Sequence, residues 1–187
     1  LEGETVLFRP FSPDRNIFLD RPANSPPKSV IFPQSDTLLS FTYKKDPEDA
    51  RKMSVELATN TDYPRMIIFG ARPCDAKGFT VYDRVYIGTN TPDPYYKGRR
   101  EKTTIVTLSC PNPSTGCFCT SVGGGPADKE GSDVIITELD SGYFAEVLTE
   151  KGETILNVSQ VKDGSSYEGK ALEKQKQVHE SVKNPFG

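Results

Sequence analysis

Tryptophan is absent from this chain of 187 residues, and histidine occurs once, at His179. One histidine excludes a metal site with two histidine ligands, and its predicted surface position in a charged terminal segment argues against a histidine-activated nucleophile. No stretch approaches the ~18 apolar residues of a membrane-spanning helix, and the start shows no secretory signal. Lys and Arg number 23 against 26 Asp and Glu, so the net charge of −3 provides no basic field for nucleic acid. We expect a cytoplasmic protein without membrane insertion.

Glycine and proline, in contrast, are plentiful at 15 each, which predicts many short elements rather than a few long helices. The length suits one domain of about 100–200 residues that can bury a hydrophobic core. The chain begins at Leu1 without methionine and stops soon after a predicted helix. We therefore expect residues 1–187 to form a single domain taken from a longer chain.

The middle of the chain predicts a β–α–β unit over residues 66–108. Two apolar runs, 66–69 and 103–108, are typical of buried strands, and a helix over about 75–86 lies between them, followed by a short helix that begins at Asp93-Pro94. Such units pair their strands in parallel through a right-handed crossover. We therefore expect an α/β fold, with α+β as the other possibility, built on a mixed sheet with helices alongside.

Weaker patterns suggest further elements around this unit. A hairpin over 134–148, turning at 140–142, would add antiparallel strands. Asp46-Pro47 and the helical spacing that follows predict a helix over 47–58. Strands are also expected over 5–8, 29–32, 38–43 and 154–158, and an amphipathic helix over 166–182 with Tyr167, Leu172, Val178 and Val182 on its apolar side.

The chain has four cysteines: Cys74, Cys110, Cys117 and Cys119. Cys74 follows the first predicted parallel strand, and Cys110 follows the second. Because the carboxyl ends of parallel strands lie at one edge of a sheet, where ligands bind, we expect these two thiols to meet there. Two prolines and a glycine would let the 110–119 loop turn back to the same place. Four converging thiols match the ligand number of a Cys₄ metal site.

The cysteine spacing leaves several interpretations open. Zinc ribbons use Cys-x-x-Cys pairs, which this chain lacks, although a zinc-stapled interaction domain without a redox role is still possible. The Cys117-x-Cys119 spacing suits a large centre such as an iron–sulfur cube better than a single ion. Two disulfides, as in secreted proteins, would also account for four cysteines, and so would buried thiols without a ligand.

Residues near the cysteines carry secondary predictions. Arg72 and Lys77 would offset the negative charge of a thiolate-ligated cluster, or else be ordinary solvated charges. Asp75 is expected to be a helix N-cap rather than a ligand. The glycines at 123–125 would let backbone N–H groups approach cluster sulfides. The basic cluster at 97–102 would dock an acidic partner or form a solvated helix face.

Several short motifs, taken together, resemble a known family. They are, in order, Ser25-Pro26-Pro27-Lys28, Phe32-Pro33-Gln34, Gly70-Ala71-Arg72-Pro73-Cys74-Asp75, Tyr82-Asp83-Arg84-Val85-Tyr86, Asp93-Pro94-Tyr95-Tyr96, Cys110, Cys117-Phe118-Cys119-Thr120 and Gly123-Gly124-Gly125-Pro126. The sequence resembles the N-terminal region of iron–sulfur electron-transfer subunits, namely the β subunit of cytosolic NiFe hydrogenases (sulfhydrogenases) and its counterpart in anaerobic sulfite reductase. The resemblance covers about residues 4–187 and is most specific at 72–75 and 117–120.

This resemblance implies one [4Fe–4S] cluster on Cys74, Cys110, Cys117 and Cys119. It implies a non-catalytic module that relays electrons between redox subunits of a hydrogenase- or sulfite-reductase-like complex. The implied partners are other redox subunits of that complex, one of them catalytic and one containing flavin. The family also carries a C-terminal ferredoxin-like part with two Cys-x-x-Cys-x-x-Cys runs, which is absent from this sequence.

Overall fold

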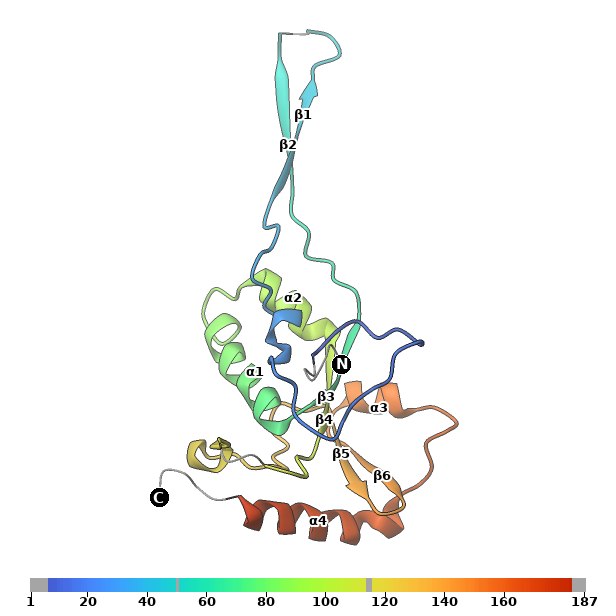
Figure 1. The fold of residues 1–187 in the computed structure, drawn as a ribbon. Coiled ribbons are helices and arrows are strands. Elements are labelled where there is room, and N and C mark those ends of the chain that lie inside the picture. Colours follow the sequence, from blue (N-terminus) through green and yellow to red (C-terminus); the bar gives the residue numbers. More distant parts are fainter. Residues whose placement is uncertain (1–6, 50, 114–115, 183–187) are drawn as a thin grey trace.

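A four-stranded mixed sheet organises the body of the chain in the computed structural model, which describes residues 7–49, 51–113 and 116–182 (Figure 1). The strands lie in the order β3-β4-β5-β6, and β3 pairs with β4, and β4 with β5, in parallel. β6 closes the sheet antiparallel to β5. The predicted α/β class, the parallel pair and the hairpin are confirmed. The strands are β3 (Met66–Ala71), β4 (Thr103–Leu108), β5 (Val134–Leu139) and β6 (Gly142–Val147).

The position of each strand in the sheet decides how far it is buried. All six residues of the central strand β4 are buried, as its continuous apolar and threonine sequence predicts. β3 lies at the edge, where Ile68 and Ala71 are buried while Ile67 and Phe69 are exposed. The prediction of a buried strand is therefore only half right, because Ile68 faces the core while Ile67 and Phe69, on the opposite face of β3, are exposed.

Two helices fill the crossover between β3 and β4, as predicted. α1 (Pro73–Tyr86) begins with proline in its first turn, and the Asp75 Oδ2 accepts a hydrogen bond from the Arg72 backbone N–H at 3.0 Å. Asp75 therefore caps from the third helical position, while Arg72 occupies the N-cap position itself. α2 (Pro94–Lys102) begins after Asp93, whose carboxylate accepts from the Tyr96 N–H at 2.7 Å.

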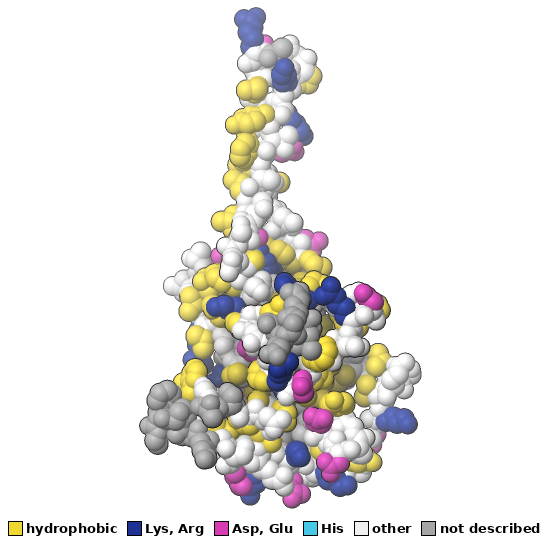
Figure 2. Space-filling view, in the orientation of Figure 1, with side chains coloured by type: hydrophobic (Ala, Val, Ile, Leu, Met, Phe, Trp, Pro, Cys, Tyr) yellow, Lys and Arg dark blue, Asp and Glu magenta, His cyan; other side chains and the backbone are white. Residues whose placement is uncertain are grey.

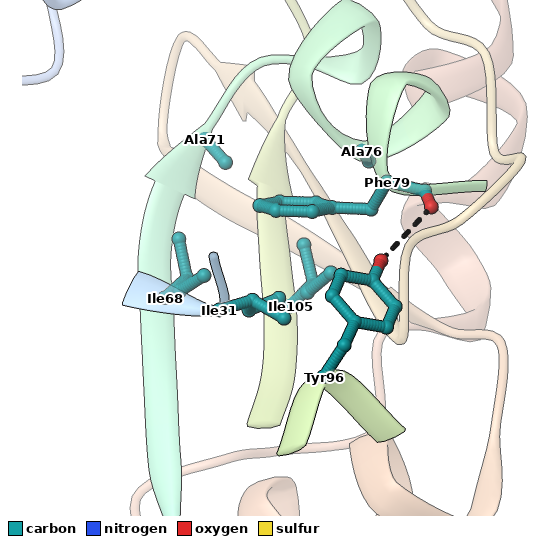
Figure 3. Close-up of a cluster of buried hydrophobic side chains, with 7 residues drawn as sticks. All are labelled: Ile31, Ile68, Ala71, Ala76, Phe79, Tyr96 and Ile105. Carbon is teal, nitrogen blue, oxygen red and sulfur yellow. Dashed lines mark hydrogen bonds between the residues drawn. The ribbon is translucent and has the colours of Figure 1, made fainter. Parts of the chain in front are cut away.

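The main hydrophobic core lies between these helices and the sheet (Figure 3). Phe79 from α1 and Tyr96 from α2 point toward the side chains of β3 and β4. The Tyr96 hydroxyl lies 3.4 Å from the Phe79 carbonyl, the bond dashed in Figure 3, and donates to the Asp83 carboxylate at 2.7 Å. That bond satisfies the polar end of a ring that is otherwise buried. The core residues are Ile31, Ile68, Ala71, Ala76, Phe79, Tyr96 and Ile105.

The C-terminal helix α4 (Glu168–Ser181) packs against β5. Its buried face is formed by Ala171, Gln175 and Val178, and the Gln175 amide donates to the buried Thr137 hydroxyl at 2.8 Å. The predicted apolar side is only partly right. Val178 is buried and Val182 is half-buried, but Leu172 and Tyr167 are exposed, because small Ala171 and hydrogen-bonded Gln175 form the contact instead. None of the described helices combines the length and the apolarity needed to cross a bilayer.

A two-stranded antiparallel ribbon, β1 (Ser40–Lys45) with β2 (Met53–Ala58), extends from the body (Figure 1). The predicted helix over 47–58 is therefore wrong. Met53, Val55 and Leu57 also alternate with polar residues, and pairing with β1 realises this period of two. Asp46 accepts from the Glu48 N–H at 2.9 Å and so begins a turn rather than a helix.

The ribbon places its apolar side chains on one face. The register sets Phe41 opposite Leu57 and Tyr43 opposite Val55, and all four side chains are exposed. Figure 2 shows this row of hydrophobic side chains along one side of the ribbon. An isolated two-stranded ribbon is marginally stable in water, and no further strand pairs with this one within the described chain.

Three other local predictions need correction. Residues 29–32 do not form a strand, because Pro27 begins the short 3₁₀ helix η1 (Pro27–Val30). The strand predicted over 154–158 is also wrong: α3 (Glu150–Leu156) is helical because the Thr149 hydroxyl caps it and two glutamates lie in its first turn. The strand predicted over 5–8 lies partly outside the described residues, and Leu7 and Phe8 have no regular structure. Two further 3₁₀ turns are η2 (Cys119–Val122) and η3 (Ser165–Tyr167).

The Phe79 ring should carry a large share of the core's stability. Phe79→Ala should lower the free energy of unfolding by about 3–5 kcal/mol, because it removes a fully buried ring and leaves a cavity. Val81→Ala in the same helix, at a side chain 55% exposed, should cost less than about 0.5 kcal/mol. Urea denaturation measures both, and similar losses for the two variants would contradict this account of the core.

Candidate functional site

The four cysteines lie at the carboxyl ends of β3 and β4 and in the loop that follows β4. Cys74 is the second residue of α1, directly after β3, and Cys110 lies two residues beyond the end of β4. Cys119 opens the short helix η2, and Cys117 precedes it in the loop. Cys110 is buried, Cys117 and Cys119 are half-buried, and Cys74 is exposed.

Electrostatic interactions link Cys74 to the loop cysteines. The pKa of the Cys74 thiol is raised to about 11, mainly by partial burial and also by the Asp75 carboxylate and the Cys119 and Cys110 thiols. A hydrogen bond from the Asp75 backbone N–H acts in the opposite direction. Cys74 is thus close enough to two of the loop cysteines for their charges to interact.

Cys110 has the same kind of environment. Burial raises the pKa of its thiol, the nearby Arg72 guanidinium lowers it, and Cys117 and Cys119 raise it again. Interactions therefore connect all four cysteines into one neighbourhood, called the cysteine site below. Within the described residues, no group of three or more His, Cys, Asp or Glu side chains is placed to hold a metal ion.

Backbone hydrogen bonds and one lysine hold the cysteine loop in place. The Cys110 N–H donates to the Pro126 carbonyl at 2.8 Å, and the Gly124 N–H donates to the Cys119 carbonyl at 2.9 Å. Gly123 ends η2 at φ +70°, a left-handed conformation that favours glycine. Its carbonyl accepts from the Lys77 ammonium of α1 at 2.6 Å. The glycine run thus fastens the loop to α1.

Lys77 uses its charge within the protein. Its ammonium lies 3.1 Å from both the Asp128 and the Glu130 carboxylates, and these bonds raise the pKa of Lys77. The sequence leaves open whether Lys77 compensates a cluster or is solvated. Instead, its ion pairs connect α1 to residues 128–130, the segment after the cysteine loop. Sequence reasoning misses this role because both acidic partners lie about 50 residues away.

His179 is exposed, as expected, yet it lies beside the same loop. A Cβ built on Gly125 would come within 2.8 Å of the His179 Nδ1, so the end of α4 packs directly against this buried glycine. No sequence pattern signals this approach, because it depends on how α4 crosses β5. The glycine run therefore serves close packing at Gly125 as well as the turn at Gly123.

Three buried polar atoms at the cysteine site lack partners. Among the described residues, the Nε and Nη1 atoms of Arg72 and the hydroxyl of Thr120 are the buried side-chain nitrogen and oxygen atoms without a hydrogen bond. Each orphaned group costs about 1–3 kcal/mol, and more when it is charged. Arg72 stands two residues before Cys74, and Thr120 directly follows Cys119. Unused donors beside four thiols fit a site for an anionic, sulfur-rich group.

The two arginines of the basic cluster at 97–102 fit neither sequence interpretation, whereas the Lys97 side chain is 45% exposed and Lys102 is exposed. Arg99 pairs with Asp36, and Arg100 pairs with Asp83 at 3.1 Å. The two arginine side chains are only 12% and 15% exposed, so they are neither a solvated face nor free to dock a partner. Arg99 connects α2 to the segment before β1, where Asp36 lies, and Arg100 connects α2 to Asp83 of α1.

Comparison with known proteins gives one partial relationship. Searches against family models and solved structures return no match. Among curated proteins, the chain is 40% identical over 88 residues to the sulfhydrogenase 2 subunit beta of Pyrococcus furiosus. This partial match supports a relationship to hydrogenase β subunits. The matched stretch is 47% of this chain but 25% of that relative, and it does not bear on the sulfite reductase side of the resemblance.

The raised pKa of Cys74 predicts slow alkylation in metal-free, reduced protein. With a pKa of about 11, only about 1% of this thiol is ionised at pH 9, against about half of an ordinary thiol. Iodoacetamide labelling, followed by mass spectrometry across a pH series, should give a midpoint near pH 11 in folded protein and near pH 9 in urea. Asp75→Asn should accelerate labelling by removing a neighbouring negative charge, and identical folded and unfolded profiles would contradict the prediction.

Proposed function

We propose that this chain is an electron-transfer module that binds one [4Fe–4S] cluster through Cys74, Cys110, Cys117 and Cys119. The observation that carries the proposal is the buried Arg72 guanidinium, whose Nε and Nη1 nitrogens have no hydrogen-bond partner among the described residues, near the Cys110 thiol, which interacts with the other cysteines. A buried cation is expensive without a counter-charge, and a thiolate-ligated cluster supplies one. The partial similarity to a hydrogenase β subunit supports the same conclusion.

The protein's own groups determine how metal binding at the cysteine site depends on pH and which loop supplies its ligands. Burial keeps the Cys74 and Cys110 thiols protonated in metal-free protein, because it raises both pKa values. Binding as thiolates then releases protons, so metal affinity should rise with pH. Lys77 and the backbone bonds of Gly124 and Cys110 fix the loop that supplies Cys117 and Cys119.

The cysteine spacing favours a cluster over a single zinc ion. In a zinc site all four sulfurs lie about 2.3 Å from one point, and paired Cys-x-x-Cys turns supply that geometry. Here one cysteine comes from the end of β3 and two others are separated by a single residue. In a [4Fe–4S] cluster each cysteine binds a different iron, which accommodates such an irregular set.

Such a cluster would take up one electron from a donor and pass it to an acceptor in a neighbouring subunit. We place the chain in a hydrogenase-like complex, because its relative is named as a subunit of a sulfhydrogenase. A sulfite-reductase-like complex is the other setting that the sequence resemblance implies. In the longer chain that the resemblance implies, a ferredoxin-like part would continue the electron path beyond residue 187.

Metal analysis of anaerobically purified protein tests the proposal. The wild-type chain should be brown and contain about four irons per chain. Replacing any one of the four cysteines with serine should remove most of this iron, because a hard oxygen ligand replaces a soft thiolate. Val122→Ser is the matched control: it introduces the same hydroxyl at an exposed position of the same loop and should leave the iron content unchanged.

A zinc site would give a different result in the same measurement. Stoichiometric zinc in colourless protein, lost with the fold on chelation, would establish the zinc-stapled domain instead. Full iron content in Cys74→Ser would remove Cys74 from the ligand set, and with it the argument from parallel strands.

A further inference from the structure

Arg72 is buried, yet the metal-free fold satisfies only part of its guanidinium. The whole residue is 4% exposed, and it lies at the junction between β3 and α1. Its Nη2 atom donates to the Leu19 carbonyl at 2.8 Å, which uses one of the donors of the guanidinium. Within the part of the chain that the structure describes, Nε and Nη1 form no hydrogen bond.

The surroundings of Arg72 hold two groups of negative character. The Asp75 carboxyl is near enough for the Arg72 charge to lower its pKa, although burial raises that pKa overall, and no ion pair or hydrogen bond joins the two side chains in the described structure. The Cys110 thiol is the second such group. The register of β3 and β4, which sets Ala71 opposite Thr107, brings the residues after each strand to the same edge.

We propose that Arg72 is a positioning residue for the cluster: its unpaired Nε–H and Nη1–H groups donate to the sulfur atoms at the Cys110 side of the cysteine site, retain the cluster and raise its reduction potential. Thr120, which directly follows Cys119, has the other buried side-chain donor without a hydrogen bond among the described residues. Hydrogen bonds to the sulfurs of an iron–sulfur cluster, and positive charge beside it, raise the potential. This inference rests on the proposed function.

Arg72 and Lys77, the two cations that flank Cys74, differ in how many of their hydrogen-bond donors are already used. Lys77 is saturated by Asp128, Glu130 and the Gly123 carbonyl. Arg72 alone of the two has donors left for a ligand. Replacing Arg72 should therefore change the reduction potential of the cluster more than replacing Lys77.

The test compares Arg72→Gln and Arg72→Lys with the wild-type chain, with Arg84→Gln as control. Arg84 lies on α1 with its side chain 76% exposed, so its replacement removes the same charge away from the buried junction. EPR-monitored redox titration should give a lower midpoint potential for Arg72→Gln, an intermediate value for Arg72→Lys and no change for Arg84→Gln. Iron release to a chelator should be several-fold faster from Arg72→Gln.

A second measurement separates this role from simple structural support. In metal-free protein, Arg72→Gln should unfold at the same or higher urea concentration than wild type, because it removes an uncompensated buried charge. Opposite effects on metal-free stability and on cluster retention support the proposal, even if the variant loses its cluster before a potential can be measured.

The outcomes that overturn the inference are distinct from those that overturn the function. An iron-loaded wild type with an unchanged potential in Arg72→Gln overturns the role of Arg72 alone. So does destabilisation of the metal-free variant that Arg72→Lys fails to rescue, which would indicate a purely structural arginine. A wild-type chain that binds no iron overturns both proposals.

Discussion

Five register pairs hold β3 parallel to β4, from Met66 opposite Thr103 to Ala71 opposite Thr107. This pairing brings together two segments that are 36 or 37 residues apart in sequence. It sets the first residues beyond each strand at the same end of the sheet. Cys74 and Cys110 occupy that end as a direct consequence. The loop that follows β4 must then reach β5, also in parallel, and it crosses over the same end with two more cysteines. The whole cysteine site depends on this parallel geometry.

The elements that fix this geometry are predictable because their local signals agree. Residues 103–108 are apolar or β-branched throughout, and prolines stand at the starts of α1 and α2. Where signals conflict, the prediction fails. Residues 53–57 fit both a helical and an alternating period, and only pairing with residues 41–45 decides between them. The helix at residues 150–156 escapes prediction because a threonine cap outweighs the β-branched residues that follow.

The candidate site is predictable only in part, for a related reason. The order of strands and cysteines along the chain predicts that the thiols approach one another. The structure places Cys74 and Cys110 just beyond the ends of β3 and β4, while a common ligand site for all four stays a prediction. The unsatisfied donors are not predictable, because they arise from burial by distant segments. The Leu19 carbonyl, more than 50 residues from Arg72, accepts one hydrogen bond from its guanidinium. Sequence spacing predicts neither that hydrogen bond nor the ion pairs between Lys77 and residues 128–130.

Arg72 and Lys77 show how burial, rather than charge alone, assigns a role. Both are cations within three residues of Cys74, and the sequence treats them as equivalent. Lys77 is fully engaged by acidic partners, so its charge is neutralised whether or not a cluster is present. Among the described residues Arg72 forms no ion pair, although the Asp75 carboxyl lies near it, and negative charge arriving at the cysteine site would compensate more of its desolvation. The metal-free fold thus retains an electrostatic cost at the position where a thiolate-ligated group would remove it, which couples the stability of this edge of the sheet to cluster binding.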